Sequence, residues 1–431
     1  MATQRETTGS GVQQHAPPPT LTLPLKGGGD LRTPVDFVHT GPGTPAGRWL
    51  RTFWQPVYRA EDLRDGRAVP IRIMGEDFTL YRGEENPHPS PLPEGEGTAS
   101  LSTQHSALST APAHLLAFRC AHRGTQLSTG WVEGNNLRCF YHGWKYDGSG
   151  QCIEQPAEPE PFCQRIKIRA YPVQEYLGLI FAYLGEGEPP PLPRFTELEN
   201  GARGVVDPTT SGTPCNFFNL LDTDPVHIYF VHRRASARGS GTDIPVLQCE
   251  ETAYGFVTYA TGSSGTWAYH THMPNVVHGR RDGGGEAITW RVPVDDDNCV
   301  SFGVNLLMLE GDAADAWWER RRTRRGVETQ RRVNELGAAI LRGEVRVHDV
   351  EDRSVLFNVQ DYTAQVGLGR IVDVEHQRLG RVDLPAIMLR SIWSREIRAL
   401  ADGRPLKQWD RPSEFLALGD IDVAPAGTAA R

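Results

Sequence analysis

The first 45 residues show little apolar periodicity. Residues 1–45 are rich in Pro, Gly and Thr, and a segment of this composition cannot bury enough apolar surface to fold. We therefore expect a disordered tail. Ordered sequence is expected to begin near Trp49, where RTFWQPVYRAEDL alternates aromatic and polar residues.

The pattern that follows predicts an all-β domain. RAVPIRIMGEDFTLYRG contains two alternating runs separated by a Gly-Glu-Asp turn, which indicates a β-hairpin. Between His114 and Leu184, short strand-like runs alternate with glycine-rich turns (HLLAFRC, LRCFYHGWKYD, RIKIRAYPV and LGLIFAYLG). Residues 84–112 contain few large apolar groups, so they predict a flexible insertion grown from a β-turn.

A Pro-rich run at 185–193 marks a domain boundary. Beyond it, Phe217–Val231 predicts a helix, and four later runs predict strands (ETAYGFVTYATG, GTWAYHTHM, AITWRVPV and CVSFGVNLLML), the last two joined in a hairpin at an Asp triplet. A charged helical segment beginning at DAADAWWERRR and a last helix around 382–401 follow. Because strands and helices do not alternate, we expect an α+β chain. Its all-β domain would span residues 46–190, and a second domain with an antiparallel sheet and helices would span 191–431.

Composition excludes several classes of protein. Of 431 residues, 39% are hydrophobic, and 45 basic against 53 acidic side chains give a net charge of −8, which argues against disorder and against a nucleic-acid partner. No apolar run approaches the roughly 18 residues of a membrane span, and the N-terminus lacks the apolar stretch of a secretory signal. Seven cysteines make no disulfide framework. We expect a soluble cytoplasmic protein that binds neither membrane nor nucleic acid.

Two loops each present one thiolate and one imidazole. Cys120 and His122 occur in CAHRG, and Cys139 and His142 in CFYHGW. Zinc fingers keep each local pair of ligands of one type, whereas both loops here mix the types. The mixed order suits a two-iron cluster in which one iron takes both cysteines and the other both histidines, the Rieske arrangement. We therefore favour a Rieske cluster over zinc.

A second set of ligands lies in CNFFNLLDTDPVHIYFVHR. Two imidazoles and a carboxylate form the facial triad of non-haem Fe(II) oxygenases, which His227 and His232 could begin. On a regular helix these two side chains would point about 140° apart, so we predict a π-type bulge between them. Without a metal, the pair would simply fill core space. Spacing does not choose the third ligand among Asp349, Glu351, Asp352, Asp361 and Asp373.

The cluster segment is recognisable as a whole. CAHRGTQLSTGWVEGNNLRCFYHGWKYDGSGQC resembles the cluster-binding segment of Rieske-type aromatic-ring-hydroxylating oxygenases, and the similarity extends over most of residues 48–400. Ala121 departs from the Pro that the family usually carries there. The loop cysteines of respiratory Rieske proteins are replaced by Thr125 and Tyr141, and IVDVEHQRLGRVDLPAI is most similar to the phthalate and phenoxybenzoate dioxygenase group.

The resemblance implies the α subunit of a terminal oxygenase with two metal centres. A [2Fe-2S] cluster would bind Cys120, His122, Cys139 and His142, and a mononuclear Fe(II) would bind His227, His232 and Asp361 of FNVQDYTAQVGLG. Asp224 would bridge the two centres between neighbouring subunits of a homotrimer. A separate reductase, with or without a ferredoxin, would supply NAD(P)H electrons so that O₂ hydroxylates, and in the main interpretation dihydroxylates, an aromatic substrate.

Two alternatives remain open. A Rieske monooxygenase acting on a C–H or O-methyl group would share every metal ligand. An electron-transfer Rieske protein would have a second domain without catalytic function. The pair His270-x-His272 belongs to a predicted strand, so both rings lie on one sheet face, where they could bind a metal, line a substrate pocket or simply pack.

Overall fold

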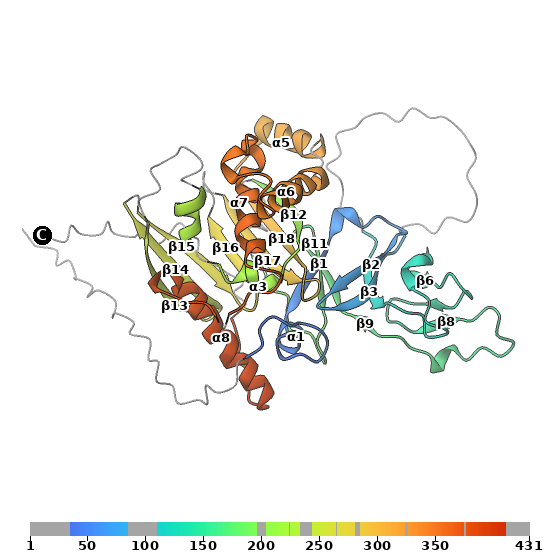
Figure 1. Ribbon diagram of the computed structural model, residues 1–431. Coiled ribbons are helices and arrows are strands. Elements are labelled where there is room, and N and C mark those ends of the chain that lie inside the picture. Colours follow the sequence, from blue (N-terminus) through green and yellow to red (C-terminus); the bar gives the residue numbers. More distant parts are fainter. Residues whose placement is uncertain are drawn as a thin grey trace, which may run out of the picture. The chain divides into compact units, whose positions relative to one another are not determined.

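The computed structural model describes residues 35–84, 110–195, 204–223, 225–232, 244–263, 265–280, 285–323, 326–374 and 376–410. Its architecture is α+β, as predicted: small antiparallel sheets occupy the first half, and one large sheet with several helices occupies the second (Figure 1). No helix in the described ranges is long and apolar enough to cross a membrane.

Three small sheets form the N-terminal domain. One has the order β2-β3-β4-β9, another β5-β6-β7-β8 and the third β1-β11-β10. Their strands are β1 (Trp54–Arg59), β2 (Ala68–Ile73), β3 (Glu76–Arg82), β4 (Ala113–Ala117), β5 (Trp131–Glu133), β6 (Asn136–Arg138), β7 (Lys145–Tyr146), β8 (Cys152–Glu154), β9 (Ala170–Tyr171), β10 (Val173–Tyr176) and β11 (Leu179–Tyr183). The predicted hairpin is confirmed as β2–β3. Its turn lies at Met74 and Gly75, both of which have positive φ, and not at Gly-Glu-Asp, because Glu76 and Asp77 already pair within β3.

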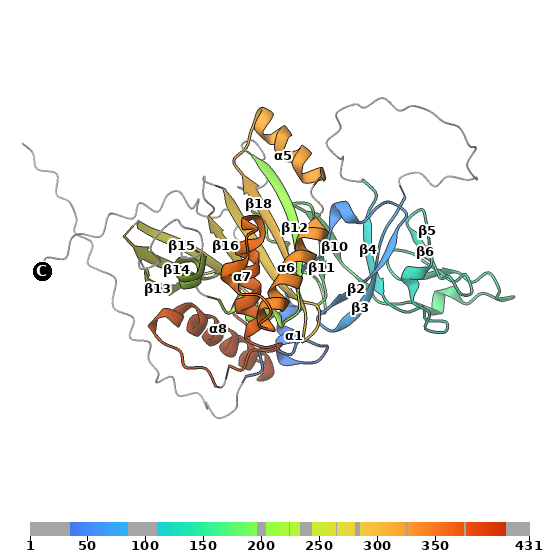
Figure 2. The same cartoon turned by 45° about the horizontal axis from the view of Figure 1, so that its top comes forward.

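One seven-stranded antiparallel sheet dominates the second domain (Figure 2). Its order is β12-β18-β17-β16-β15-β14-β13. The strands are β12 (Val205–Thr213), β13 (Val246–Glu251), β14 (Gly255–Gly262), β15 (Gly265–His272), β16 (Val276–Arg280), β17 (Glu286–Pro293) and β18 (Cys299–Leu307). The hairpin predicted at the Asp triplet is confirmed, because Pro293 pairs with Cys299 across it.

The two faces of this sheet differ in packing. Because side chains alternate along a strand, the register places one set of residues of β15, β16 and β17 on a face where all are buried: His270, His272, Val276, His278, Ile288 and Trp290. On the opposite face every one of the following is only half-buried: Tyr269, Thr271, Val277, Gly279, Thr289 and Arg291. The second face is closed on the flanking strands, where Thr258 of β14 and Ser301 of β18 are buried. We call the two faces of β15–β17 the buried face and the half-buried face.

Six α-helices occur in the described ranges: α1 (Pro45–Leu50), α3 (Phe217–Leu221), α5 (Gly311–Thr323), α6 (Gly326–Leu341), α7 (Arg353–Gly367) and α8 (Leu384–Ala401). The charged segment and the last helix were predicted, and both are confirmed as α5–α6 and α8. The helix predicted over Phe217–Val231 ends early, since α3 stops at Leu221. Trp393 of α8 packs against Trp49 of α1 and Phe217 of α3, with ring centroids 4.6 and 5.8 Å away, and so fixes α3 in the core.

Part of the predicted tail is folded. Phe37 is buried and stacks on Phe218 at 5.3 Å, and the Thr40 backbone N–H donates to Asp296. Residues 36–45 therefore belong to the packed chain. Residues 1–34 of the tail, and residues 85–109 of the insertion, lie outside the described residues.

Candidate metal centres

Each cysteine-histidine loop is a tight turn closed by a glycine. The Gly124 N–H donates to the Cys120 carbonyl at 2.9 Å, and the Gly143 N–H donates to the Cys139 carbonyl at 3.1 Å. Both glycines have positive φ, 77° and 74°, a conformation that costs other residues free energy. The turns therefore let one short segment present a thiol and an imidazole on the same side.

The four predicted cluster ligands lie together. Cys120 and Cys139 are buried in the core of the domain, whereas His122 and His142 are half-buried, with ring centroids 4.6 Å apart. Burial raises the pKa of the Cys139 thiol, and the neighbouring Cys120 raises it further. Burial, His122 and Arg123 lower the pKa of His142. Two neighbouring thiolates need a compensating positive charge, which the irons of a Rieske cluster would supply.

Two aromatic residues that our sequence analysis did not single out contact these ligands. The Tyr146 hydroxyl accepts a hydrogen bond from the Ala121 N–H at 3.2 Å and lies 3.2 Å from Cys120 Sγ, so its proton is free to point at the sulfur. Trp144 stacks on the ring of His122, with centroids 4.6 Å apart and planes 9° apart. Their signal is their place in HGWKY, directly after the second loop.

We expect Tyr146→Phe to lower the reduction potential of the cluster. A hydrogen bond to a ligand sulfur stabilises the more negative, reduced state. If the bond differs by about 1 kcal/mol between oxidation states, its loss shifts a one-electron potential by roughly 40 mV. Redox titration followed by EPR would measure the shift. An unchanged or higher potential in a variant with full iron content would contradict the assignment of this contact.

The histidines of the second centre lie on one face of a distorted helix. Residues Ile228–His232 form a π-helix, which confirms the predicted distortion. Because a π-helix bonds residues i and i+5, side chains five positions apart come together, and the ring centroids of His227 and His232 are 5.4 Å apart. Asp224 lies outside the described residues.

Among the five acidic candidates, the structure brings Asp361 to the histidines. Its Oδ1 lies 2.9 Å from His232 Nε2 and 4.0 Å from His227 Nε2. One ligand atom from each of the three residues lies within 4.8 Å of the others, and no other group of this kind occurs among the described residues. Asp361 comes from α7, a helix that the sequence analysis did not delimit. Val355, Leu356, Val359 and Tyr362 of α7 belong to a buried cluster with Val333 of α6, which fixes the helix.

Gln360 orients one of the histidines. Its Oε1 lies 2.8 Å from His232 Nδ1, and both residues are buried. An amide oxygen only accepts, so Nδ1 carries the proton and the neutral ring leaves Nε2 as a lone pair. That nitrogen is buried and has no partner in hydrogen-bond geometry, although the Asp361 oxygen lies 2.9 Å away. Two acceptors that face each other at this distance fit a shared cation.

We expect Fe(II) binding to weaken as the pH falls below neutrality. Burial lowers the pKa of His232, but Asp361 and Gln360 raise it, and the net result lies above the usual 6.5. In the metal-free protein this attraction stabilises the fold fully below pH 6.5 and is lost as the pH rises through the raised pKa. Iron must displace the same proton, so Kd should rise about tenfold per pH unit below that pKa. Titration of metal-free protein with Co(II) at about pH 6, 7 and 8 would measure it, and a constant Kd would contradict it.

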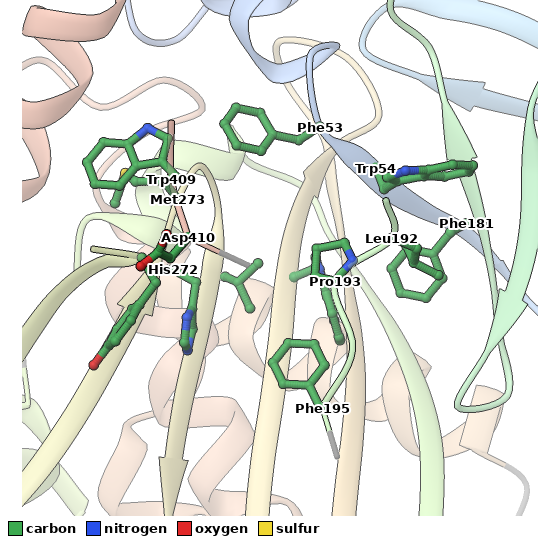
Figure 3. Close-up of a pocket in the computed structure, with 13 residues that line it drawn as sticks. Phe53, Trp54, Phe181, Leu192, Pro193, Phe195, His272, Met273, Trp409 and Asp410 are labelled. Atoms are coloured by element: carbon green, nitrogen blue, oxygen red, sulfur yellow. The ribbon is translucent and has the colours of Figure 1, made fainter. Parts of the chain in front are cut away.

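His270 and His272 belong to neither centre. His272 lines a cavity of about 50 Å³ whose walls are mostly aromatic (Figure 3). The cavity lies against the buried face of the sheet, with Phe195 packed edge-on to His272 and Trp290. It is smaller than the roughly 150 Å³ that accommodates benzene, and it is not the place for an aromatic substrate. Burial lowers the pKa of His270 to about 4, so this ring is neutral at pH 7.

Comparison with known proteins gives a consistent result. The family model of the Rieske [2Fe-2S] domain matches residues 53–176. The chain is 28% identical to the 5,5'-dehydrodivanillate O-demethylase oxygenase subunit of Sphingobium sp., over 86% of this chain and 81% of that protein. It is 35% identical to the phenoxybenzoate dioxygenase subunit alpha of Ectopseudomonas oleovorans, over 44% of each.

Solved structures share the fold. The terminal oxygenase of carbazole 1,9a-dioxygenase from Nocardioides aromaticivorans superposes with a TM-score of 0.58 at 17% identity, over 82% of this chain and 99% of that one. An oxygenase in a complex with the ferredoxin of carbazole 1,9a-dioxygenase superposes with a TM-score of 0.55 at 17% identity, over 85% of this chain and 94% of that one. The chain therefore contains a Rieske [2Fe-2S] domain followed by an α+β domain, and over most of its length it is similar to proteins named as oxygenase subunits.

Proposed function

We propose that this oxygenase hydroxylates an aromatic substrate with O₂, using NAD(P)H electrons that a separate reductase delivers. The observation that carries the proposal is that one chain has a Rieske domain with Cys120, His122, Cys139 and His142 gathered in two loops, and a second domain with His227, His232 and Asp361 gathered around one point. An electron-transfer protein has no use for the second group. Relatives named as dioxygenases support an aromatic substrate.

The two groups of residues would hold the cofactors of the family. When bound, the cluster supplies single electrons and the mononuclear iron supplies O₂ activation. The protein's own part is to position ligands: Tyr146 donates toward Cys120, and Gln360 holds the proton of His232 on Nδ1 so that Nε2 faces Asp361. Burial of both cysteines keeps water from their sulfurs.

We further propose that the oxygenase works as a homotrimer. Asp224, three residues before His227, would accept hydrogen bonds from the ring N–H of His227 and from that of a neighbouring subunit's cluster histidine. A carboxylate between two ligand imidazoles fixes both tautomers and shortens the electron path. The solved complexes of related oxygenases with ferredoxin support a protein electron donor.

A second function is favoured by one observation. Relatives named as an O-demethylase subunit and as a tert-butanol monooxygenase subunit cover 86% and 87% of this chain, whereas the three compared relatives named as dioxygenases cover 44%, 46% and 49% of it. O-demethylation and dihydroxylation share the metal ligands and differ in the products. Turnover under ¹⁸O₂ separates them, because a dihydroxylase gives a diol with two labelled oxygens and a demethylase releases formaldehyde.

The first test is the metal content of the purified protein. About three irons and two sulfides per chain, with the low-average-g EPR signal of a reduced cluster with histidine ligands, are expected. Two irons and two sulfides that cannot be supplemented with Fe(II) would leave an electron carrier. Zinc without sulfide would overturn the proposal.

A further inference from the structure

The two cluster-binding loops share one repeated pattern. We call residues 120–124 the first loop and residues 139–143 the second loop. In both, the cysteine N–H donates to the carbonyl five residues later, and the glycine N–H donates back to the cysteine carbonyl. In both, the residue directly before the cysteine is an arginine. The two backbone turns are therefore equivalent, and the two arginines occupy equivalent positions.

Each of these arginines binds the last carbonyl of its loop. Arg119 Nη1 donates to the Gly124 carbonyl at 2.9 Å, and Arg138 Nη1 donates to the Gly143 carbonyl at 2.8 Å. Glycine restricts its backbone less than any other residue, so the peptide bond that follows it can rotate unless its carbonyl is held. A guanidinium on that carbonyl restrains the turn that carries the histidine ligand.

Arg138 is much better anchored than Arg119. Its five N–H groups meet five acceptors at distances from 2.6 to 3.1 Å: both carboxylate oxygens of Glu133, both of Glu154 and the Gly143 carbonyl. The Arg138 side chain is 18% exposed, whereas Arg119 is an exposed residue. Because the guanidinium is planar and rigid, a guanidinium with every donor bound has a fixed orientation.

The partners of Arg138 connect it to a whole sheet. Lys145 Nζ also contacts both carboxylates, at 3.1 Å from Glu133 and 2.8 Å from Glu154. Glu133, Arg138, Lys145 and Glu154 belong to β5, β6, β7 and β8 in turn, so each strand of that sheet supplies one charge. Hydrogen bonds from Arg138 and Lys145 lower the pKa of Glu154 to about 2, and its charge is therefore present at neutral pH. Single exposed ion pairs add little stability, but this network ties the Gly143 carbonyl to four strands.

We propose that Arg138 is a positioning residue for the cluster ligand His142, and that Arg119 is its weaker counterpart for His122. Arg138 connects the second loop to a four-stranded sheet, so the ring of His142 is held in one orientation. The first loop, which is restrained by an exposed arginine, is the more adaptable of the two. The inference goes beyond the proposed function, because it concerns the cluster alone and holds for any reaction that the cluster serves.

The test is pulsed EPR of the full-length, dithionite-reduced protein, because the nitrogen couplings of the two histidines report the orientation of each ring. Arg138→Gln removes the bond to Gly143, so it should change the couplings of one histidine. Arg119→Gln should change those of the other histidine, and by less. Loss of the cluster to a chelator, followed by absorbance, should be about 10-fold faster in Arg138→Gln, as expected when a group that orients a ligand is removed.

Lys145→Gln is the matched control, because it removes one positive charge from the same two carboxylates and leaves the bond between Arg138 and Gly143. Redox titration should show a lower cluster potential in both Arg138→Gln and Lys145→Gln, whereas only Arg138→Gln should change the nitrogen couplings. Arg138→Lys keeps the charge without the planar set of donors, so its potential should recover while its couplings stay altered.

Unchanged couplings in Arg138→Gln and Arg138→Lys, with full iron and sulfide, would overturn the proposal. Equal changes of coupling in Arg138→Gln and Lys145→Gln, or full recovery in Arg138→Lys, would assign the effect to charge and overturn it as well. If both Arg138 variants lost the cluster while Lys145→Gln and Arg119→Gln kept it, Arg138 would be a folding residue, which also refutes the proposal. No measurement here needs a substrate, so a wild type with an intact cluster and no turnover would refute the proposed function alone.

Discussion

Replacing Asp361 by alanine is expected to remove one of about three irons from each chain and to leave both sulfides in place. Asp361 is the only anionic member of the group that approaches His227 and His232. Without it, two neutral imidazoles remain, too few ligands to retain Fe(II) through purification. A bound metal lowers the reaction barrier by several kcal/mol. Without it, turnover should fall on the order of 10³-fold or more.

Iron and sulfide analysis, together with the EPR signal of the reduced cluster, would measure the effect. Asp349→Ala is the matched control, because Asp349 is another acid that sequence spacing left open and it pairs only with the exposed Arg346 in the described structure. Three irons in Asp361→Ala, or two in Asp349→Ala, would show that the third ligand has been assigned to the wrong helix.

Replacing Asp224 by asparagine is expected to leave both metal contents intact and nearly abolish turnover. An amide keeps the size of the carboxylate but loses the charge that holds two ligand imidazoles in matching tautomers. The reduced cluster should then lose its electron much more slowly. Stopped-flow absorbance, after dithionite reduction and mixing with O₂ and substrate, would follow this step directly.

The control for Asp224→Asn is Asp222→Asn, two residues away. The Asp222 side chain is 5% exposed and pairs with Arg390 of α8, so its loss should lower the melting temperature, since it leaves an enclosed charge unpaired. Turnover per folded, iron-loaded chain should be retained. Full activity in Asp224→Asn would refute the bridging role, and equal losses of activity in both variants would reduce it to local stability.

Local patterns of the sequence predicted the features that depend on neighbouring residues. The cluster ligands follow from two short loops, and the π-helix at Ile228–His232 follows from the mismatch between five-residue spacing and an α-helical turn. The hairpins were predictable for the same reason, because a turn and its flanking alternation lie within about 15 residues.

Features that depend on distant contacts were not predictable from spacing. Asp361 was chosen by resemblance, because only the packing of α7 against α6 decides which acid faces the histidines. Gln360 and Tyr146 acquire their contacts from helix phase and strand register, which single-sequence patterns do not fix. His270 and His272 share one face of β15, as predicted. The sequence did not show that this is the buried face, because the packing of layers against the sheet decides it.

The adjacent residues Gln360 and Asp361 link the position of α7 directly to His232. The two side chains reach opposite nitrogens of one ring, Nδ1 and Nε2 of His232, from adjacent positions of one rigid rod. A small sliding or tilting of α7 would therefore disturb the ligand and its orienting amide together, and neither could compensate for the other. Val359 is fully buried on the side of α7 that faces α6, and its packing fixes the position of the helix. The affinity of this centre for iron would thus depend partly on hydrocarbon packing that never touches the metal.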